Sequence, residues 1–451
     1  MAALVNIRRN GRCFAVACVL LAAATLPACA QQTPAPSAPQ QAPASASFKC
    51  PHPADPHRRP RACNNEDFLM DETLAGGWDH VRQVLKRIGI TPTASYVGAI
   101  QTNVEGGTDQ VWSYAGQFSF GASADLEELI DVPGLSAYVG ISWGTGSNLS
   151  ASLDSTIPSS GLYAPSFYLG EMYLQEKLHR DKLNLLAGRL AAGNGFASLP
   201  VFSNYVSYGI NPNPYSLPAN DATFAGPPPG AEWGAQVSYE VSRSIQIETG
   251  VFNTNVNSAN GANHGADFAL QEGNKGALLI SELDYLRNQS DKAIGKPGQI
   301  TAGFLHNNNS FTALNSPLVR SGGYNGVYLM AQQMVYRPHG PGTGQGATVW
   351  GTWTFNSKDL VSPIPQFWGA GVSDQGLIPA RKNDVVSLGV VRAEGSKYGP
   401  PSNTEGQLEL NYQWVHSRYL TITPHGQYSW QDRDHLGRSA TVLGVQVGLT
   451  L

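Results

Sequence analysis

The sequence predicts an all-β protein, namely a 16-stranded antiparallel transmembrane β-barrel with a short N-terminal periplasmic helix. Three observations point to this fold class. Apolar and polar residues alternate with a period of two from Thr91 onward, which indicates strands because successive side chains of a strand point to opposite faces. Sixteen such segments fit into the chain, and their connections alternate between short and long.

The first region, residues 1–30, is predicted to be a signal peptide. A basic start with Arg8, Arg9 and Arg12 precedes the apolar run "CFAVACVLLAAATL", and "ACA" at 28–30 provides small residues for cleavage. The apolar run is too short to cross a membrane as a helix. An alternative takes "LPAC" as a lipidation site at Cys29, and in both cases the protein leaves the cytoplasm.

Residues 31–70 are expected to form a disordered linker rich in Pro, Gln and Ala, because this composition cannot bury a core. Cys50 and Cys63 lie in it and could form one disulfide in an oxidising compartment. His52 and His57 between them suggest a metal site as an alternative, but their spacing matches no standard zinc pattern. A metal site is therefore not expected in this segment.

Residues 71–90 are predicted to form a helix packed on the end of the barrel. In "LAGGWDHVRQVLKRIGI" the apolar residues recur at helical spacing on one face, and Gly89 ends the helix. These apolar residues are Leu74, Trp78, Val81, Leu85 and Ile88. The barrel itself is expected to occupy residues 91–451.

The sixteen candidate strands follow from the period-two pattern and from the turn residues between them. They lie near residues 94–104, 112–124, 135–144, 167–177, 183–190, 232–240, 245–253, 276–286, 299–307, 326–336, 347–355, 366–372, 384–392, 406–414, 420–430 and 441–451.

The connections are sorted by length. Those at 178–182, 241–244 and 416–419 are very short, and each joins an even-numbered strand to the next odd one. The longest, at 145–166, 191–231 and 254–275, all join an odd-numbered strand to an even one. Short turns on one side and long loops on the other are typical of outer-membrane barrels, whereas a soluble sandwich has no reason to sort its loops.

The composition decides which environment the apolar face meets. The polar face is rich in Gln, Asn, Ser, Thr and Gly rather than in the Lys and Glu of soluble surfaces, and the apolar face of the best strands carries no charge. A midplane Lys or Arg on a lipid-facing wall would cost about 2–4 kcal/mol. Aromatic residues near strand ends suit interfacial girdles: Trp112, Tyr114, Trp143, Trp414 and Trp430.

The strand number indicates a channel, because sixteen strands enclose an aqueous lumen whereas eight enclose only side chains or a small ligand. Charged residues make up 14% of the chain and the net charge is -4, so a nucleic-acid partner is not expected. The expected surroundings are outer-membrane lipid and the barrel assembly machinery, and a homo-oligomer is an open alternative.

Several stretches resemble the OprB-type carbohydrate-selective porins of Gram-negative outer membranes, and the resemblance runs from Leu74 to Leu451. The stretches that carry it are "LAGGWDHVRQVLKRIGI", "EWGAQVSYEVSRSIQIETGVFNTN", "GALLISEL", "GLIPARKND", "EGQLELNYQW" and "TITPHGQY". The resemblance implies passive uptake of mono- and oligosaccharides into the periplasm, without a cofactor and without enzymatic activity.

Residues that select sugars are expected on the lumen face, where carboxylates, amides or Arg can bind hydroxyl groups and aromatic rings can pack against the C–H faces of a sugar. The candidates are Glu171, Arg189, Glu248, Glu282, Asp284, Glu409, Phe196 and Tyr205. The alternative for each acid is an ordinary polar lining residue. Arg189 shares the parity of Leu183 and Leu185, so a bulge would be needed to turn it inward.

Phe196 and Tyr205 belong to the long connection 191–231. This connection is expected either to fold into the lumen or to form a surface loop held by its own aromatic residues.

Three other functions are alternatives to the sugar porin. A non-selective or acid-selective general porin is the nearest. A secreted β-rich sugar-binding protein would show the same alternation. An outer-membrane hydrolase would need Ser, His and an acid in hydrogen-bond reach, and no nucleophile motif surrounds His416 or His425.

Overall fold

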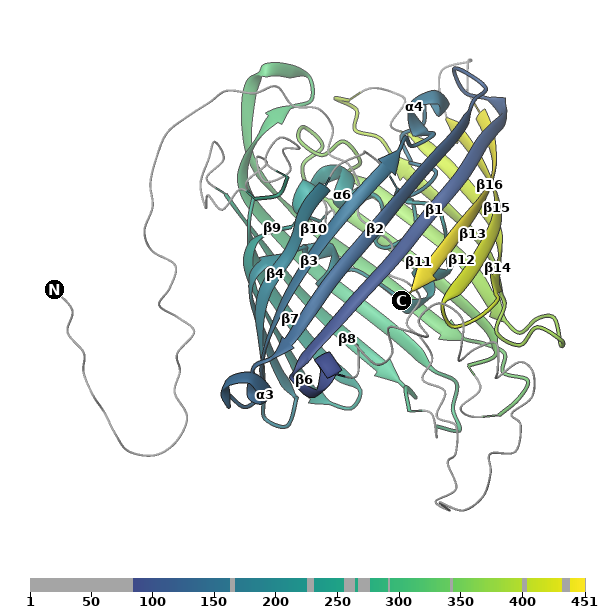
Figure 1. Cartoon of the computed structure of the whole chain (residues 1–451). Helices are drawn as coiled ribbons and strands as arrows, with labels where there is room; N and C mark the ends of the chain where they lie inside the picture. Colours follow the sequence, from purple (N-terminus) through teal and green to yellow (C-terminus); the bar gives the residue numbers. More distant parts are fainter. Residues whose placement is uncertain are drawn as a thin grey trace. The chain divides into compact units, whose positions relative to one another are not determined.

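In the computed structural model, sixteen antiparallel strands close into one barrel (Figure 1). The structure describes residues 84–162, 167–224, 231–254, 264–266, 276–290, 293–340, 344–399, 404–431 and 439–450. The predicted signal peptide, the linker with Cys50 and Cys63, and most of the N-terminal helix lie outside these residues. Within the described part of that helix, residues 84–87 are helical.

The strands follow one another around the ring in chain order. They are β1 (Ile90–Gly106), β2 (Trp112–Asp125), β3 (Leu135–Gly146), β4 (Phe167–Leu178), β5 (Leu183–Leu190), β6 (Glu232–Ser242), β7 (Ile245–Asn253), β8 (Ala277–Arg287), β9 (Gly298–Ala313), β10 (Ser316–Met334), β11 (Gly346–Asn356), β12 (Gln366–Gln375), β13 (Val385–Glu394), β14 (Glu405–Val415), β15 (Leu420–Gln431) and β16 (Ser439–Thr450).

Short helical turns occur in the connections. They are α3 (Leu126–Ile130), α4 (Ser150–Leu153), α5 (Ala192–Gly195), η1 (Pro200–Asn204), α6 (Ser216–Asn220) and η2 (Ala222–Phe224). None of the helices among the described residues is long and apolar enough to cross a membrane.

The last strand closes the ring by pairing with the first. Tyr96 lies opposite Leu449 and Gln101 lies opposite Gly444 in the β1–β16 ladder. Closure matters because lipid offers no hydrogen-bond partner to an open strand edge. The predicted 16-stranded antiparallel barrel is confirmed.

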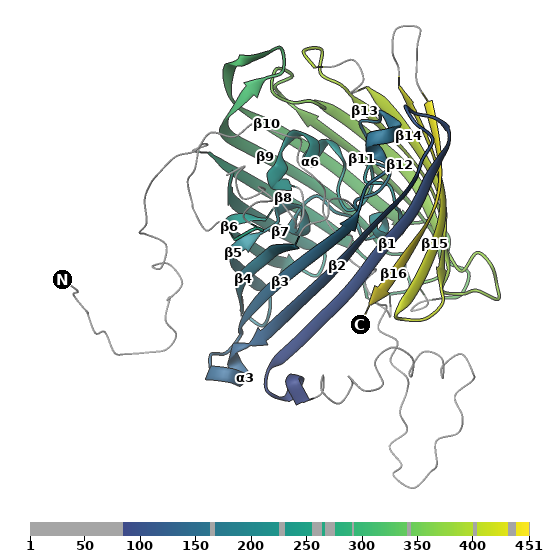
Figure 2. The ribbon, with the colours of Figure 1, turned by 45° about the horizontal axis from the view of Figure 1, so that its top comes forward.

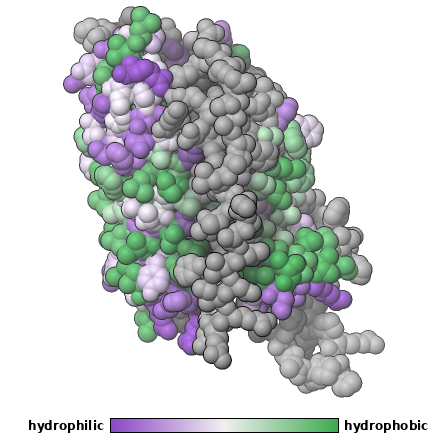
Figure 3. All heavy atoms as spheres, turned by 90° about the vertical axis from the view of Figure 1, so that its left-hand side faces the viewer, coloured by the Kyte–Doolittle hydropathy of each residue, from purple (hydrophilic) through white to green (hydrophobic). Residues whose placement is uncertain are grey.

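The two faces of the wall differ as the alternation predicts. On β16, Leu443 is 51% exposed on the outer wall, whereas its neighbour Val442 is 2% exposed on the lumen side. Trp112, at one end of β2, is 77% exposed. Hydrophobic side chains spread over the middle of the visible outer wall, and hydrophilic ones gather mainly toward its margins (Figure 3).

The sorting of the connections by length is incomplete. The connections 288–297 and 335–345 contain ten and eleven residues although they lie on the side of the short turns. The turn between β9 and β10 contains only Leu314 and Asn315, although it lies on the side of the long loops. β10 pairs with β11 only from Gly326 onward, so Ser316–Asn325 extend with the end of β9 beyond the barrel rim as a two-stranded hairpin (Figure 1). The sequence prediction stopped short of this extension because two register shifts interrupt its alternation.

An irregularity in β4 turns one side chain to the face that strict alternation does not predict. The β3–β4 register shifts between Val139 and Ile141. Tyr168 therefore lies opposite the buried Ser142 and is itself buried, whereas strict alternation with Met172 and Leu174 predicts it on the outer wall. A bulge inserts one extra residue, so the parity of every residue beyond it changes.

Candidate functional site

The connection between β5 and β6 folds into the barrel. We call its described residues, 191–224, the inner loop. Figures 1 and 2 show its helix α6 within the ring of strands. Phe196, Phe202 and Tyr205 of this loop are buried in one hydrophobic cluster with wall residues such as Trp350. The two alternatives for this connection are therefore decided in favour of the lumen.

Aromatic contacts fix the loop against β11. The ring of Trp350 lies 5.2 Å from that of Phe202 and 5.5 Å from that of Tyr205, both edge to face. Trp350 Nε1 donates to Tyr205 Oη over 2.8 Å, and that hydroxyl donates to the carbonyl oxygens of Val372 or Leu388, each 3.1 Å away. Burial raises the pKa of Tyr205 to about 12, so its hydroxyl stays protonated at neutral pH.

Carboxylates of the wall hold the backbone of the inner loop. Glu282 Oε2 accepts from the backbone N–H of Ala197 over 2.7 Å. Glu409 accepts from the N–H of Val206 over 2.8 Å and from that of Ser207 over 2.6 Å. A loop inside a barrel has no strand partner for its N–H groups, and each buried N–H needs an acceptor. These acids supply the acceptors.

Glu171 performs the same task where the inner loop begins. Its two carboxylate oxygens accept from the backbone N–H of Ala191 and from Asn194 Nδ2, each over 3.0 Å. Three of the predicted sugar-binding acids thus engage the inner loop, and a sugar contact through the same oxygens would compete with these bonds.

A second connection, residues 147–162 between β3 and β4, also reaches the lumen face. Glu405 on β14 accepts from the backbone N–H of Thr156 over 2.7 Å and of Ile157 over 3.3 Å. Gln427 on β15 donates to the carbonyl oxygen of Ser159 over 2.8 Å. Glu405 was not among the predicted site residues. Its parity with Glu409 on the same strand was the signal that could have found it.

The remaining predicted acids, Glu248 and Asp284, line the wall of β7 and β8 beside Glu282. Gln236 Nε2 donates to Glu248 over 3.2 Å, and Gln299 Nε2 donates to Asp284 over 3.2 Å. Glu248 lies directly opposite Glu282 in the strand register. In the described part of the chain, no group of His, Cys, Asp and Glu has the arrangement to hold a metal ion.

Two predicted aromatic contacts turn away from the channel. Phe196 is 0% exposed and Tyr205 is 1% exposed, because both rings pack between the inner loop and the wall. Their rings contribute to the seating of the loop and offer no free face to a solute.

Arg189 does not meet the condition for an inward orientation. The register of β5 runs without a shift through Arg189 against both β4 and β6, so its side chain leaves the strand on the face of Leu183 and Leu185. Its guanidinium donates to the carbonyl oxygen of Ala231 over 3.0 Å and to that of Gly265. The register therefore shows no shift at Arg189 that would turn it inward, and its side chain is buried.

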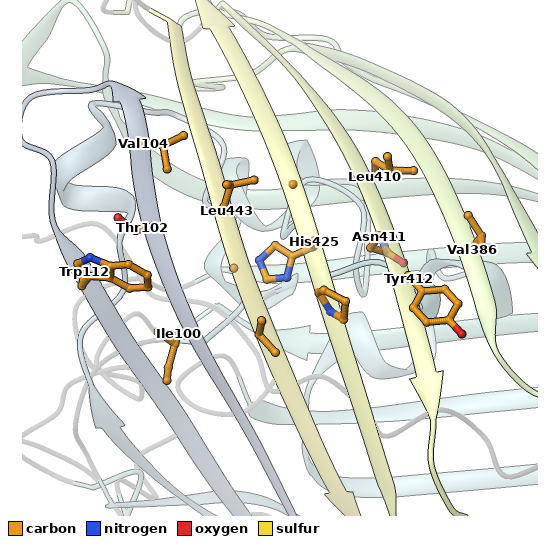
Figure 4. A pocket seen from close by; sticks show the side chains of 14 residues that line it. Ile100, Thr102, Val104, Trp112, Val386, Leu410, Asn411, Tyr412, His425 and Leu443 are labelled. Atoms are coloured by element: carbon orange, nitrogen blue, oxygen red, sulfur yellow. The ribbon is translucent and has the colours of Figure 1, made fainter.

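One hollow of about 980 Å³ lies on the outer wall and not in the lumen. Ile100, Val104 and Trp112 line one side, and Leu410 and Leu443 line the other (Figure 4). All five side chains belong to the exposed apolar face. The hollow therefore faces lipid and is not a route for a polar solute.

Comparison with known proteins agrees with this architecture. A model of the carbohydrate-selective porin family OprB matches residues 109–451. The candidate porin QuiX from Acinetobacter baylyi is 22% identical over 409 residues, which cover 81% of this chain and 90% of that protein. A structure of Pseudomonas putida OprB at high pH has a TM-score of 0.75 at 20% identity, covering 83% of this chain and 97% of the other. The low-pH structure has a TM-score of 0.57 at 19% identity, covering 84% and 98%.

Proposed function

Because this chain belongs to the OprB family of carbohydrate-selective porins and forms a sugar channel of the Gram-negative outer membrane, we propose that its inner loop sets the width of the channel. Sugars diffuse passively through the space that the loop leaves open, and no chemical conversion accompanies their passage. The observation that carries the proposal is the seating of residues 191–224 on the lumen face by Glu282 and Glu409.

In this proposal the passage runs along the part of β3 and β4 around Tyr138 and Gln175. Lumen-facing side chains of β8 and β14 such as Leu278, Ile280 and Gln407 are buried under the loops. Tyr138 on β3 and Gln175 on β4 are only half-buried. A sugar therefore passes between the inner loop and this wall.

The predicted site residues divide by role in this proposal. Glu171, Glu282 and Glu409 hold the inner loop and thereby act on selectivity indirectly. Glu248 and Asp284 contribute polar lining beside the loop. The apolar outer wall faces outer-membrane lipid, into which the barrel assembly machinery would insert the protein.

Liposome swelling with the purified protein tests the proposal. Glucose, maltose and maltotriose should enter faster than into protein-free liposomes, and faster than gluconate, an anion of similar size to glucose. Entry of the sugars no faster than in empty liposomes would contradict the sugar channel. Equal or faster entry of gluconate would instead support a general or acid-selective porin.

A further inference from the structure

Two tyrosines face the lumen on β3 and β4, beside the point where Glu171 holds the start of the inner loop. Tyr138 on β3 lies directly opposite Tyr173 on β4, and their ring centroids are 5.2 Å apart with an interplanar angle of 31°. Val139 and Trp143 are exposed on the outer wall, so Tyr138 points to the lumen. Both tyrosines are half-buried. Together they form a continuous aromatic surface toward the channel.

Glycines underneath make the ring of Tyr138 lie flat. A Cβ atom placed on Gly140 would lie 2.9 Å from Tyr138 Oη and 3.1 Å from its Cε1 atom. A Cβ on Gly121 would lie 2.7 Å from the same Oη and 3.1 Å from Cε2. The two edges of the ring thus cover two glycines of neighbouring strands. A ring that lies flat on the wall presents its face, not its edge, to the lumen.

The inner loop holds the second ring in place. Tyr173 packs against the hydrophobic cluster that the inner loop forms with the wall. Glu171, two residues earlier on the same face of β4, binds the start of the loop at Ala191 and Asn194. The tyrosine pair therefore lies beside the point where the loop enters the lumen.

Amide groups follow the tyrosines along the same face. Gln175 lies two residues after Tyr173, a spacing of about 6.6 Å along a strand. Its Nε2 donates to Asn184 Oδ1 on β5 over 2.8 Å. The Gln175 carbonyl oxygen and the Asn184 N–H groups take no part in this bond. Both an acceptor and a donor therefore adjoin the aromatic surface.

We propose that Tyr138 and Tyr173 form a stacking platform for the apolar C–H face of a pyranose ring, while Gln175 and Asn184 bind its hydroxyl groups. The inference rests on the proposed function and specifies the contact that a sugar makes in the channel. Aromatic faces with a few convergent polar groups are the usual composition of small-molecule sites. An inorganic ion gains little from such a surface, so the platform favours sugars over salt.

Sugar-induced block of ion current through single channels in a planar bilayer tests the platform. Maltotriose is the probe, and the concentration that halves the current is measured together with the current in its absence. Tyr138→Leu should raise the half-blocking concentration roughly three- to tenfold, the range expected for the loss of one aromatic contact. Tyr138→Phe keeps the ring and should remain close to wild type. Tyr239→Leu, on the outer wall, is the matched control.

Gly140→Ala is a second variant that keeps the tyrosine. Its new methyl group would displace the ring of Tyr138, so the half-blocking concentration should rise as it does for Tyr138→Leu. Heat-modifiable migration on a gel shows which variants fold. If both folded variants are blocked like wild type, the platform is wrong, whereas the sugar channel stands. If wild type itself shows neither block nor entry of sugars into liposomes, the proposed function fails and the platform fails with it.

Discussion

Glu409 on β14 holds the backbone nitrogen of Ser207 at 2.6 Å, although the two residues are 202 positions apart in the chain. The same carboxylate holds Val206, and Asn411 Nδ2 donates to the carbonyl oxygen of Asn204 over 2.9 Å. One short stretch of β14 therefore fixes the middle of the inner loop.

The first prediction concerns this anchor. Glu409→Ala should leave two buried N–H groups without their acceptor, at a cost of about 1–3 kcal/mol for each group. The loop should loosen, so that single-channel conductance and current noise rise while the ratio of sugar to salt permeability falls. Planar-bilayer recordings and liposome swelling measure these quantities. Glu240→Ala on β6 is the matched control. An equal effect of this variant would contradict the role of Glu409 as an anchor of the inner loop.

The second prediction concerns the hydroxyl of Tyr205. Tyr205→Phe removes the acceptor of the buried Trp350 N–H, which costs about 1–3 kcal/mol when no other partner replaces it. Local opening of the inner loop should become easier by that amount. Backbone amides of residues 205–211 should therefore exchange hydrogen faster, by roughly 5- to 150-fold. Unchanged exchange would show that this hydrogen bond does not hold the loop.

The third prediction is a dependence on alkaline pH. The pKa of Tyr205 is raised by burial to about 12, above the ordinary tyrosine value of about 10. A raised pKa means that the seated loop favours the protonated hydroxyl. This contribution is fully present below about pH 10 and is lost as the pH rises through about 12. Channel selectivity should fall over this window in wild type more than in Tyr205→Phe, for which the hydroxyl cannot ionise. Parallel falls in both proteins would assign the change to other groups.

The fourth prediction tests the two faces of the closing strand with adjacent residues. Val445→Lys places a charge on the lipid-facing wall and should lower the free energy of unfolding by about 2–4 kcal/mol if it lies near the midplane. Gln446→Lys places the same charge on the lumen face and should change conductance with little loss of stability. Denaturant unfolding of the protein in liposomes measures the first effect, and bilayer recordings measure the second. The opposite order of stabilities would reverse the assigned faces.

The wall of the barrel could be predicted from the sequence because its signal is local. The alternation on β14, from Leu408 to Trp414, predicts which residues face lipid without information from any other strand. The errors occur where local parity breaks. The register shift between β3 and β4 turns Tyr168 inward. The register shifts in the β9–β10 hairpin interrupt the alternation, so the sequence predicts shorter strands there.

The interior could be predicted only in part, because its contacts join distant segments. The alternation predicted that Glu171, Glu282 and Glu409 face the lumen. The sequence around them does not predict that N–H groups of the inner loop bind their carboxylate oxygens. Tyr173 has the same parity as Glu171, so it could have been placed in the channel.

The positions of the inner-loop anchors also tie the seating of the loop to the completion of the barrel. Residues 206 and 207 have no carboxylate to bind until β14 has joined the sheet, and β14 is followed by only two strands before the ring closes. Contacts of such long separation form late, because the intervening chain must be ordered first. The complete seat of the inner loop therefore requires β14, the third strand from the end of the chain. A barrel that lacks β14 and the two strands after it lacks both a closed wall and the anchor of residues 206 and 207.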